Sequence, residues 1–287
     1  MTIRSFDGVT ALVTGAGSGI GLAIAGRLAC RRCRLALVDV RMDRLSAAKR
    51  RLAPLSPAVT VYRADVGDEE AVARLRDRVT VDHARVSILV NSAGVSLAGS
   101  FLECTPDDLE WVMRVNFWGT VHCCRAFLPD MLRNGGGQIV NIGSCFGWVG
   151  YPGKSVYCAS KFAVRGFSES LRAELRGTSV GVTVVYPGPV DTNLIWDGLA
   201  VDDRQRADEV AFLAGRAIRP DRVAEKAVEA IERNTARVLV GRDYRLIDLA
   251  VRLAPSWTLG VLSRLGGLRR FGGSPAGAAR DREHPGA

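Results

Sequence analysis

Lysine and histidine are scarce in this chain of 287 residues, which contains 39 Lys and Arg together but only three His. The four lysines are Lys49, Lys154, Lys161 and Lys226, so Lys161 stands out slightly. The sequence also lacks an uninterrupted apolar run of the ~20 residues that a membrane-spanning helix needs. It opens with no signal-peptide pattern. We therefore expect a cytoplasmic protein without a membrane span.

Metal-binding and nucleic-acid-binding patterns are missing as well. Cys30 and Cys33 form a CxxC pair, but no second pair or His cluster completes a zinc site among the seven cysteines. We expect reduced thiols. The formal net charge is +9, yet the arginines are scattered between acids and no basic run is interleaved with aromatic residues. This pattern indicates a solvated surface that favours an anionic cofactor and argues against a nucleic-acid partner.

Short β-branched runs alternate with helical patterns along the chain, and a hydrophobic content of 47% suits one large globular domain. This alternation predicts an α/β fold with a doubly wound, parallel, seven-stranded sheet that is covered by helices on both faces. The predicted strands are Val9–Thr14, Leu35–Val38, Val59–Tyr62, Val86–Val90, Gln138–Ile142, Gly181–Tyr186 and Val238–Val240. The clearest helix start is Thr105 with Pro106 at the first helical position, and that helix is expected to continue through Asn116.

A glycine-rich turn, TGAGSGIG at Thr14–Gly21, follows the first strand and opens a helix. Glycines allow close approach of the backbone to a phosphate, and a helix N-terminus offers unpaired N–H groups and a positive dipole end. The spacing Gly15, Gly19, Gly21 matches the general dinucleotide fingerprint only loosely. A glycine turn with no ligand is the alternative interpretation.

Asp39 ends the second strand, 18 residues after Gly21. An acid at about this distance accepts hydrogen bonds from the adenosine ribose and repels a 2′-phosphate, which favours NAD over NADP. Arg41 keeps NADP open, because an arginine here can accommodate that phosphate. A simple helix-start acid is the alternative for Asp39.

Tyr157 and Lys161 lie four residues apart, which puts them on one face of a helix. A nearby ammonium favours the phenolate and lowers the tyrosine pKa, so the pair can exchange a proton with an alcohol or carbonyl oxygen. Ser144 precedes this helix and could hydrogen-bond the same oxygen. By itself the pair would more often be an ordinary one on a solvated helix face.

The positions of the candidate residues favour the functional interpretation. Six of them fall at or just after the predicted carboxyl ends of strands, the edge where doubly wound sheets bind ligands. These are Gly15, Asp39, Asp65, Asn91, Ser144 and Pro187.

These ordered motifs, from Gly8 to about Thr192, resemble the short-chain dehydrogenase/reductase family. The resemblance implies a dinucleotide site and an oxidoreductase acting on an alcohol or ketone. The implied cofactor-binding residues are Gly15, Ser18, Gly19, Ile20, Gly21, Asp39, Arg41, Asp65, Val66, Asn91, Ala93, Gly94, Tyr157, Lys161, Pro187, Gly188, Val190 and Thr192. Two positions depart from the family pattern: Ser92 replaces an asparagine, and Gly143 stands where many members carry serine.

The resemblance also implies the catalytic roles. Tyr157 takes the alcohol proton, Ser144 positions the substrate oxygen, and Lys161 lowers the pKa of Tyr157 and binds the nicotinamide ribose. Asn116 holds a water that connects Lys161 to solvent. Two other functions stay open: an NADP-dependent carbonyl reductase, and a dinucleotide-binding sensor without turnover. The family suggests a homodimer or homotetramer.

The domain is expected to span residues 1–271, with a substrate lid at about 192–219, a helical extension at 242–271 and a disordered tail at 272–287. Apolar residues of the lid and near the catalytic edge suggest a hydrophobic alcohol such as a steroid or retinoid, although they could equally pack lid against core. They are Val95, Leu97, Cys145, Phe146, Trp148, Val149, Ile195, Trp196, Leu199, Phe212 and Leu213. Residues 242–287 carry eight Arg against four acids, which leaves contact with a membrane surface as a minor hypothesis.

Overall fold

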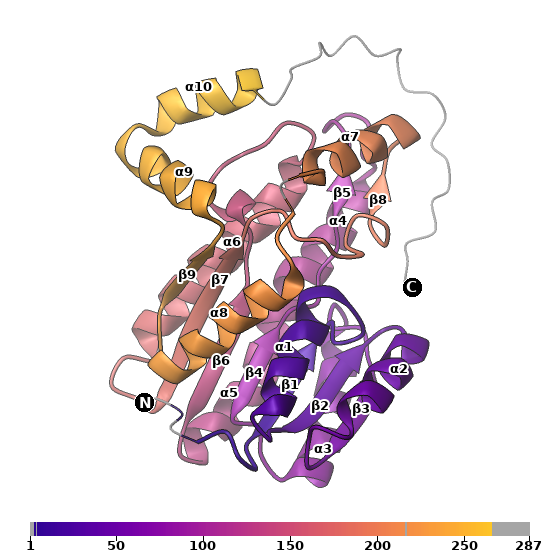
Figure 1. Ribbon diagram of the computed structural model, residues 1–287, viewed down its shortest axis with the longest axis vertical. Coiled ribbons are helices and arrows are strands. Elements are labelled where there is room, and N and C mark those ends of the chain that lie inside the picture. The colour runs from indigo at the N-terminus through magenta and orange to yellow at the C-terminus, as the bar shows by residue number, and fades with distance from the viewer. Residues whose placement is uncertain (1–2, 4, 216, 266–287) are drawn as a thin grey trace.

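Parallel strands and helices alternate along the chain in the computed structural model, which describes residues 3, 5–215 and 217–265 (Figure 1). The expected tail at 272–287 and the end of the helical extension lie outside this described part. The seven strands of the main sheet are β1 (Thr10–Thr14), β2 (Arg34–Asp39), β3 (Val59–Arg63), β4 (Ile88–Asn91), β6 (Gly137–Ile142), β7 (Val180–Pro187) and β9 (Arg237–Val240).

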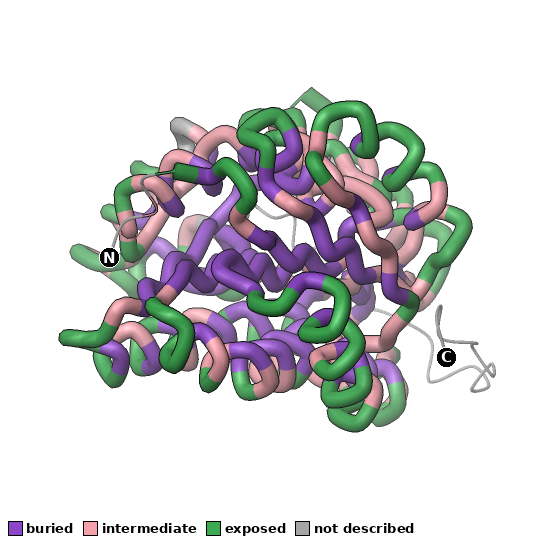
Figure 2. Tube along the Cα trace, turned by 90° about the horizontal axis from the view of Figure 1, so that it is seen from below, coloured by how far each residue is buried: buried purple, intermediate pink, exposed green. Residues whose placement is uncertain are grey.

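The spatial strand order is β3-β2-β1-β4-β6-β7-β9, and every pairing is parallel. The order reverses between β1 and β4, the point at which such sheets open a crevice at their carboxyl edge. The sheet forms a buried layer between two layers of helices (Figure 2). The predicted seven-stranded doubly wound fold is confirmed.

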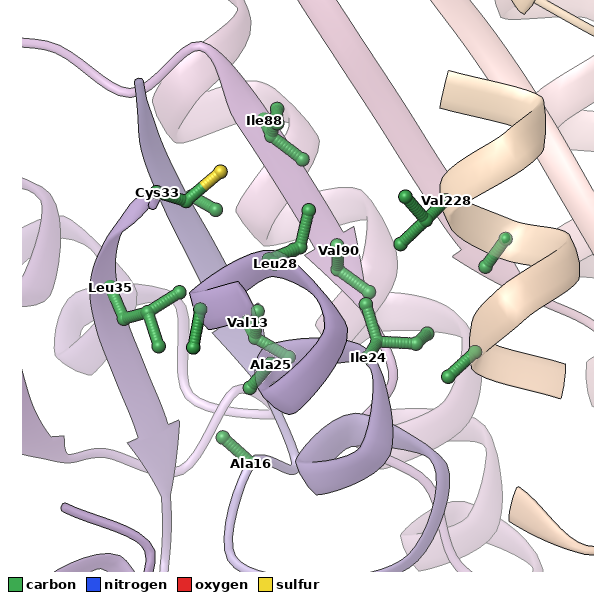
Figure 3. Close-up of a cluster of buried hydrophobic side chains, with 14 of the residues drawn as sticks. Val13, Ala16, Ile24, Ala25, Leu28, Cys33, Leu35, Ile88, Val90 and Val228 are labelled. Atoms are coloured by element: carbon green, nitrogen blue, oxygen red, sulfur yellow. The ribbon is translucent and has the colours of Figure 1, made fainter. Parts of the chain in front are cut away.

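Two hydrophobic clusters hold the helices on the two faces of the sheet. Because side chains alternate along a strand, Val13 of β1 faces one cluster and Leu12 faces the other. The first cluster joins the sheet to α1 (Gly19–Cys30), α2 (Met42–Leu52) and α8 (Pro220–Arg233), and part of it is shown in Figure 3. The second joins it to α3 (Glu69–His83), α5 (Gly119–Arg133) and α6 (Ser155–Glu174).

The helix that begins after Thr105 is not uniform. The Thr105 hydroxyl accepts from the Asp108 N–H at 3.1 Å, as expected of a cap, and the Asp108 carboxylate accepts from the Thr105 N–H at 3.0 Å, which completes a capping box before α4 (Pro106–Met113). A π-helical turn, Arg114–Trp118, then separates α4 from α5. The wider turn contains Asn116, and such turns frequently mark functional sites.

The predicted lid and the loop after β4 contain elements that the sequence did not predict. A small parallel sheet pairs β5 (Leu97–Ala98) with β8 (Leu199–Ala200), and α7 (Asp203–Leu213) follows it within the lid. The chain continues from β9 into α9 (Arg242–Leu253) and α10 (Pro255–Leu265). Within the described residues, no helix combines the length and hydropathy needed to cross a bilayer. All seven cysteines are free.

Leu28 of α1 tests the cluster in Figure 3, since its side chain is fully buried between α1 and the sheet. We expect Leu28→Ala to lower the free energy of unfolding by about 2 to 5 kcal/mol, because the truncation leaves a cavity that neighbouring side chains fill only in part. Denaturant unfolding measures the change. Val81→Ala on the surface of α3 is the control, and an equal loss in both variants would contradict this packing.

Candidate active site

Tyr157 and Lys161 lie inside the protein, on the buried face of α6. Their exposed fractions are 7% and 6%, and the Lys161 Nζ lies 5.9 Å from the centroid of the Tyr157 ring. Lys161 donates a hydrogen bond to the Ile142 carbonyl at 3.1 Å, which ties α6 to the carboxyl end of β6. The alternative of an ordinary pair on a solvated helix face is therefore wrong.

The pKa of Tyr157 differs from the expectation. Burial raises it well above the ordinary value, and a hydrogen bond from Ser144, which lowers it, does not offset the burial. The physical reason is that a phenolate loses its hydration in this enclosed position. The expected lowering by Lys161 is not found in the protein alone.

Burial acts on Lys161 in the opposite direction and lowers its pKa to about 8. The ammonium is therefore mostly charged near neutral pH and loses its proton as the pH rises through about 8. Near neutral pH, the site thus holds a cation beside a neutral phenol.

Ser144 begins a short 3₁₀ turn, Cys145–Gly147, directly after β6. Its Oγ accepts from the Phe146 N–H at 3.2 Å, and this contact fixes the hydroxyl beside Tyr157. The neighbouring Gly143 departs from the family pattern for a packing reason. A Cβ at this position would lie 3.0 Å from the Tyr186 ring, so a serine would require that ring to move.

Asn116, in the π-helical turn, organises the loop after β4. Its Oδ1 accepts from the Val95 N–H at 2.8 Å, and its Nδ2 donates to the Val95 carbonyl at 3.0 Å and to Ser160 Oγ at 3.1 Å. Ser160 in turn donates to the Tyr157 carbonyl at 2.7 Å. A Cβ on Gly94 would lie 3.1 Å from Asn116 Oδ1 and 3.6 Å from Lys161 Nζ, so the loop passes close to both residues.

The glycine turn has the features that a phosphate group requires. Gly15 adopts a φ of 63°, and a Cβ on it would lie 2.9 Å from the Ala93 backbone. A Cβ on Gly21 would come within 2.3 Å of the Gly15 carbonyl oxygen, so α1 can start this close to β1 only with glycine. Ser18 is the N-cap of α1, but its side chain makes no capping hydrogen bond, and the first turn contains no acid. This N-terminus fits a dinucleotide pyrophosphate.

The loop after β4 is fastened to the glycine turn. The Thr14 hydroxyl accepts from the N–H groups of Ser92 and Ala93 at 3.0 and 3.1 Å. Asn91 points away from this loop into a buried polar chain, in which its amide donates to Asn141 Oδ1 at 2.8 Å. The sequence did not predict the hydrogen bond between Asn91 and Asn141, because no sequence pattern relates one polar residue within an apolar strand to a partner on the next strand.

Asp39 lies at the far end of the glycine turn. Its carboxylate accepts from the Gly17 N–H at 2.9 Å and from the Arg41 N–H at 3.0 Å. The Arg41 guanidinium pairs with Asp43 at 3.0 Å, so it is engaged away from Asp39. Asp39 is therefore not only a helix-start acid, because it fixes the backbone of the glycine turn.

A second arginine near Asp39 was missed by the sequence analysis. Arg44 of α2 forms two hydrogen bonds with Asp197 of the predicted lid, at 2.5 and 2.8 Å. This interaction, with Asp39 adding to it, raises the pKa of Arg44. The pair links the lid to the glycine-turn side of the molecule, and no spacing in the sequence signals it.

The other predicted cofactor residues lie along the carboxyl edge of the sheet, although some of their side chains already bond to other parts of the protein. Asp65 accepts from the Gly67 N–H at 2.8 Å and from the Arg114 guanidinium at 2.6 Å, while Val66 is buried. Ile20 lies half-buried in the first turn of α1. A Cβ on Gly19 would meet the Thr192 methyl group at 3.1 Å.

The segment after β7 joins the glycine turn to the last strand. Gly188 donates to the Val240 carbonyl at 3.0 Å, and Val190 bridges to Ile218. A Cβ on Gly188 would lie 2.4 Å from the Tyr244 ring, so α9 covers this segment directly. Pro187 ends β7 at the same edge.

Most of the apolar residues near the catalytic edge belong to the core. Cys145, Trp148 and Val149 pack against Tyr186 in one buried cluster, and Leu97 packs against Trp111 and Val112 in another. Phe146 is different, because its ring centroid lies 6.3 Å from that of Tyr157.

The apolar residues of the predicted lid differ in exposure. Ile195 is buried and Trp196 is exposed, while the Phe212 side chain lies outside those described.

The sequence analysis also missed an ion pair beside Tyr157, in which Lys154 is buried and Glu209 is largely covered. Lys154 Nζ lies 5.7 Å from the Tyr157 ring centroid, donates to Ser96 Oγ at 2.8 Å, and pairs with Glu209 of α7. Burial lowers the pKa of Lys154 to about 7, and the adjoining carboxylate favours the charged form. The scarcity of lysine was the only sequence signal for this residue.

Comparison with known proteins agrees with this geometry. The family model described as short chain dehydrogenase matches residues 9–199. The Mycobacterium tuberculosis protein SadH, an oxidoreductase by name, is 38% identical over 258 residues, which cover 88% of this chain and 94% of SadH. D-threitol dehydrogenase of Mycolicibacterium smegmatis is 38% identical over 227 residues, covering 77% and 85%. Human 17-beta-hydroxysteroid dehydrogenase type 1 is 41% identical over 187 residues, covering 63% and 56%.

Two solved structures extend the comparison to cofactor complexes. A Burkholderia phymatum short chain dehydrogenase/reductase in complex with NAD superposes with a TM-score of 0.81 at 29% identity, covering 96% of this chain and 100% of the other. A metagenomic short-chain oxidoreductase in complex with NADP has a TM-score of 0.70 at 29% identity, covering 83% and 98%. With its parallel seven-stranded sheet and glycine turn, this chain belongs to the short-chain dehydrogenase/reductase family of NAD(P)-dependent oxidoreductases that act on CH–OH groups.

Proposed function

We propose that this protein oxidises an apolar secondary alcohol with NAD, or catalyses the reverse reduction, and that Ser144, Tyr157, Lys161 and Asn116 form its catalytic site. The observation that supports this proposal best is the buried grouping of a phenol, an ammonium and a serine hydroxyl at the carboxyl edge of the sheet. A sensor without turnover would have no need to keep these groups together in a low-dielectric position, where each ionised group is costly.

Tyr157 serves as the base in this mechanism: its phenol first loses its own proton toward solvent, and the resulting phenolate takes the hydroxyl proton of the alcohol. The Ser144 hydroxyl, held by the Phe146 N–H, hydrogen-bonds the substrate oxygen. The charged Lys161 stabilises the phenolate that forms, and its remaining N–H donors are available to a cofactor ribose. The nicotinamide, when bound, accepts the hydride.

Asn116 contributes to the proposed site by holding neighbouring segments in place. Its side chain fixes Val95 and Ser160, so the π-helical turn holds α6 and the loop after β4 in register around Lys161. We propose that a water held at this turn connects Lys161 to solvent, so that the proton taken up by Tyr157 leaves after each oxidation and the phenolate is regenerated; in the reverse reduction the same route supplies the proton.

NAD is the preferred cofactor in this proposal. Asp39 places a carboxylate where a 2′-phosphate would have to lie. The two arginines that could neutralise that phosphate, Arg41 and Arg44, are engaged by Asp43 and Asp197. Because the Arg41 pair is exposed and weak, an NADP-dependent carbonyl reductase is the second cofactor hypothesis.

The substrate class rests on Phe146 beside Tyr157, the lid residues Ile195 and Trp196, and the similarity to a steroid dehydrogenase. A polyol is the second candidate substrate. It is supported by the polar side chains of Lys154, Ser96 and Glu209 near Tyr157, and by the similarity to a threitol dehydrogenase. Screening NADH production over steroids, retinoids, aliphatic alcohols and polyols decides between them.

Tyr157→Phe tests the catalytic assignment. We expect turnover to fall by about 100-fold or more, because the substrate proton loses its acceptor. NAD binding, followed by protein fluorescence, is expected to stay close to that of the wild type, since the ring and its packing remain. Near-normal turnover in this variant would remove Tyr157 from the mechanism.

Asp39→Ala tests the cofactor preference. We expect the ratio of the NAD and NADP dissociation constants to move toward NADP by about tenfold, or 1.4 kcal/mol, because a repulsive charge and a ribose acceptor are lost together. Titration with both dinucleotides measures the ratio. Asp7→Asn, an exposed acid at the other end of β1, is the control. An unchanged ratio in Asp39→Ala would contradict the assignment.

Glu209→Gln tests whether α7 acts as a lid held by the ion pair with Lys154. None of the described side chains of α7 is fully buried, so this polar contact has a large share in seating the helix. We expect trypsin to cleave at Arg204 about tenfold faster in the variant, because an unpaired buried cation destabilises the closed position. Asp208→Asn on the exposed face of α7 is the matched control, and equal cleavage of the two variants would refute the seating role.

A further inference from the structure

The helices α9 and α10 expose an apolar stripe, which consists of three leucines of α9 and one tryptophan of α10. Leu246, Leu249 and Leu253 of α9 are 71%, 53% and 77% exposed, and Trp257 of α10 is 68% exposed. The spacings of three and four residues place the three leucines on one face of α9. Large apolar side chains that cluster in this way, in contrast to scattered ones, indicate an interaction surface.

Charged residues are distributed unequally around α9. Arg245 and Arg252 are exposed, and helical spacing places them on either side of Leu249 on the same outer face. Asp248 faces inward, where it is buried and pairs with Arg237 of β9 at 2.9 Å. Arg252 also approaches Asp248 at 3.3 Å, but that carboxylate already has a partner in Arg237. Among the described side chains of α9, the outer face thus combines leucine with arginine and has no acid.

Exposed leucine and tryptophan beside arginine favour an anionic lipid surface as the partner. A basic helix face with leucine and tryptophan is typical of segments that lie in the headgroup region of a bilayer, where the apolar groups insert and the arginines meet anionic lipids. A second copy of the chain fits less well, because a two-fold contact through this face would bring arginines of the two copies together. The sequence from residue 242 onward is basic as a whole, with eight Arg against four acids.

The location of the stripe agrees with such a role. Figure 1 shows α9 and α10 beyond the end of β9, at the same end of the molecule as α7. This is also the end at which the strands terminate and Tyr157 is held. We propose that the outer face of α9, with Trp257 of α10, docks the protein on the surface of an anionic lipid bilayer. The docking is independent of the proposed substrate, but it would bring the predicted lid close to lipid.

Co-sedimentation with vesicles tests the docking on the full chain and requires no turnover. We expect the wild type to sediment with phosphatidylcholine vesicles that contain phosphatidylglycerol, and to bind pure phosphatidylcholine vesicles much less, with binding that weakens as salt rises. The double variant Leu249→Ser/Leu253→Ser is expected to bind about tenfold less, because two inserted side chains are lost.

Matched controls identify the face. Val81→Ser/Leu102→Ser removes two apolar side chains that are 86% and 88% exposed on other parts of the surface, and is expected to bind like the wild type. Arg245→Gln is expected to bind less tightly and with a weaker salt dependence. The fluorescence of the wild type is expected to shift to shorter wavelength with anionic vesicles, and this shift is expected to be reduced in Trp257→Phe. Thermal unfolding confirms that each variant is folded.

Three results would overturn the proposal. The first is the absence of binding to phosphatidylglycerol vesicles. The second is equal binding by the α9 double variant and the wild type. The third is a wild-type oligomer that ignores vesicles and dissociates in the α9 double variant, which would make this face an interface between copies of the chain.

Discussion

The burial of an ammonium and a phenol next to each other is the constraint on which the rest of the site depends. Lys161 and Tyr157 are both almost inaccessible to water, and burial acts against the charged form of each. The protein tolerates this because α6 is held from two sides: Lys161 donates to the Ile142 carbonyl, and Asn116 of the π-helical turn donates to Ser160. In the proposed mechanism the same low dielectric makes the two groups useful, since a cation acts most strongly on a neighbouring phenolate where water is excluded.

The parallel sheet solves the problem of bringing distant residues to this point. Strands β1, β4, β6 and β7 end at one edge, so the glycine turn, the loop after β4 and the Ser144 turn lie side by side although they are far apart in sequence. Thr14 fastens the loop after β4 to the glycine turn, and Thr192 contacts Gly19. The cofactor and substrate sides of the proposed site therefore share one framework.

Local patterns predicted the parts of this framework that depend on local rules. The strands follow from apolar runs, the start of α4 from the capping sequence at Thr105, and the tight turn from Gly15 and Gly21. The remaining parts depend on tertiary contacts. The π-helical turn at Asn116 and the ion pair of Lys154 with Glu209 join segments that no spacing relates. Trp148 was open to two interpretations because an apolar residue near a site can line a pocket or pack in the core, and only its contact with Tyr186 decides.

The pKa of Tyr157 shows the same limit of sequence reasoning. The spacing of Tyr157 and Lys161 predicts that the cation lowers the phenol pKa, but the cost of burial is set by every neighbouring group and dominates in the protein alone. We therefore infer that the charged Lys161 makes the decisive contribution during turnover. The most direct measurement is the pH dependence of kcat/KM for NAD-dependent oxidation in the wild type and in Lys161→Met. We expect the rise in rate with pH to move to higher pH in the variant, since the phenolate loses its cation; a pH profile with an unchanged midpoint would rule out this role of Lys161.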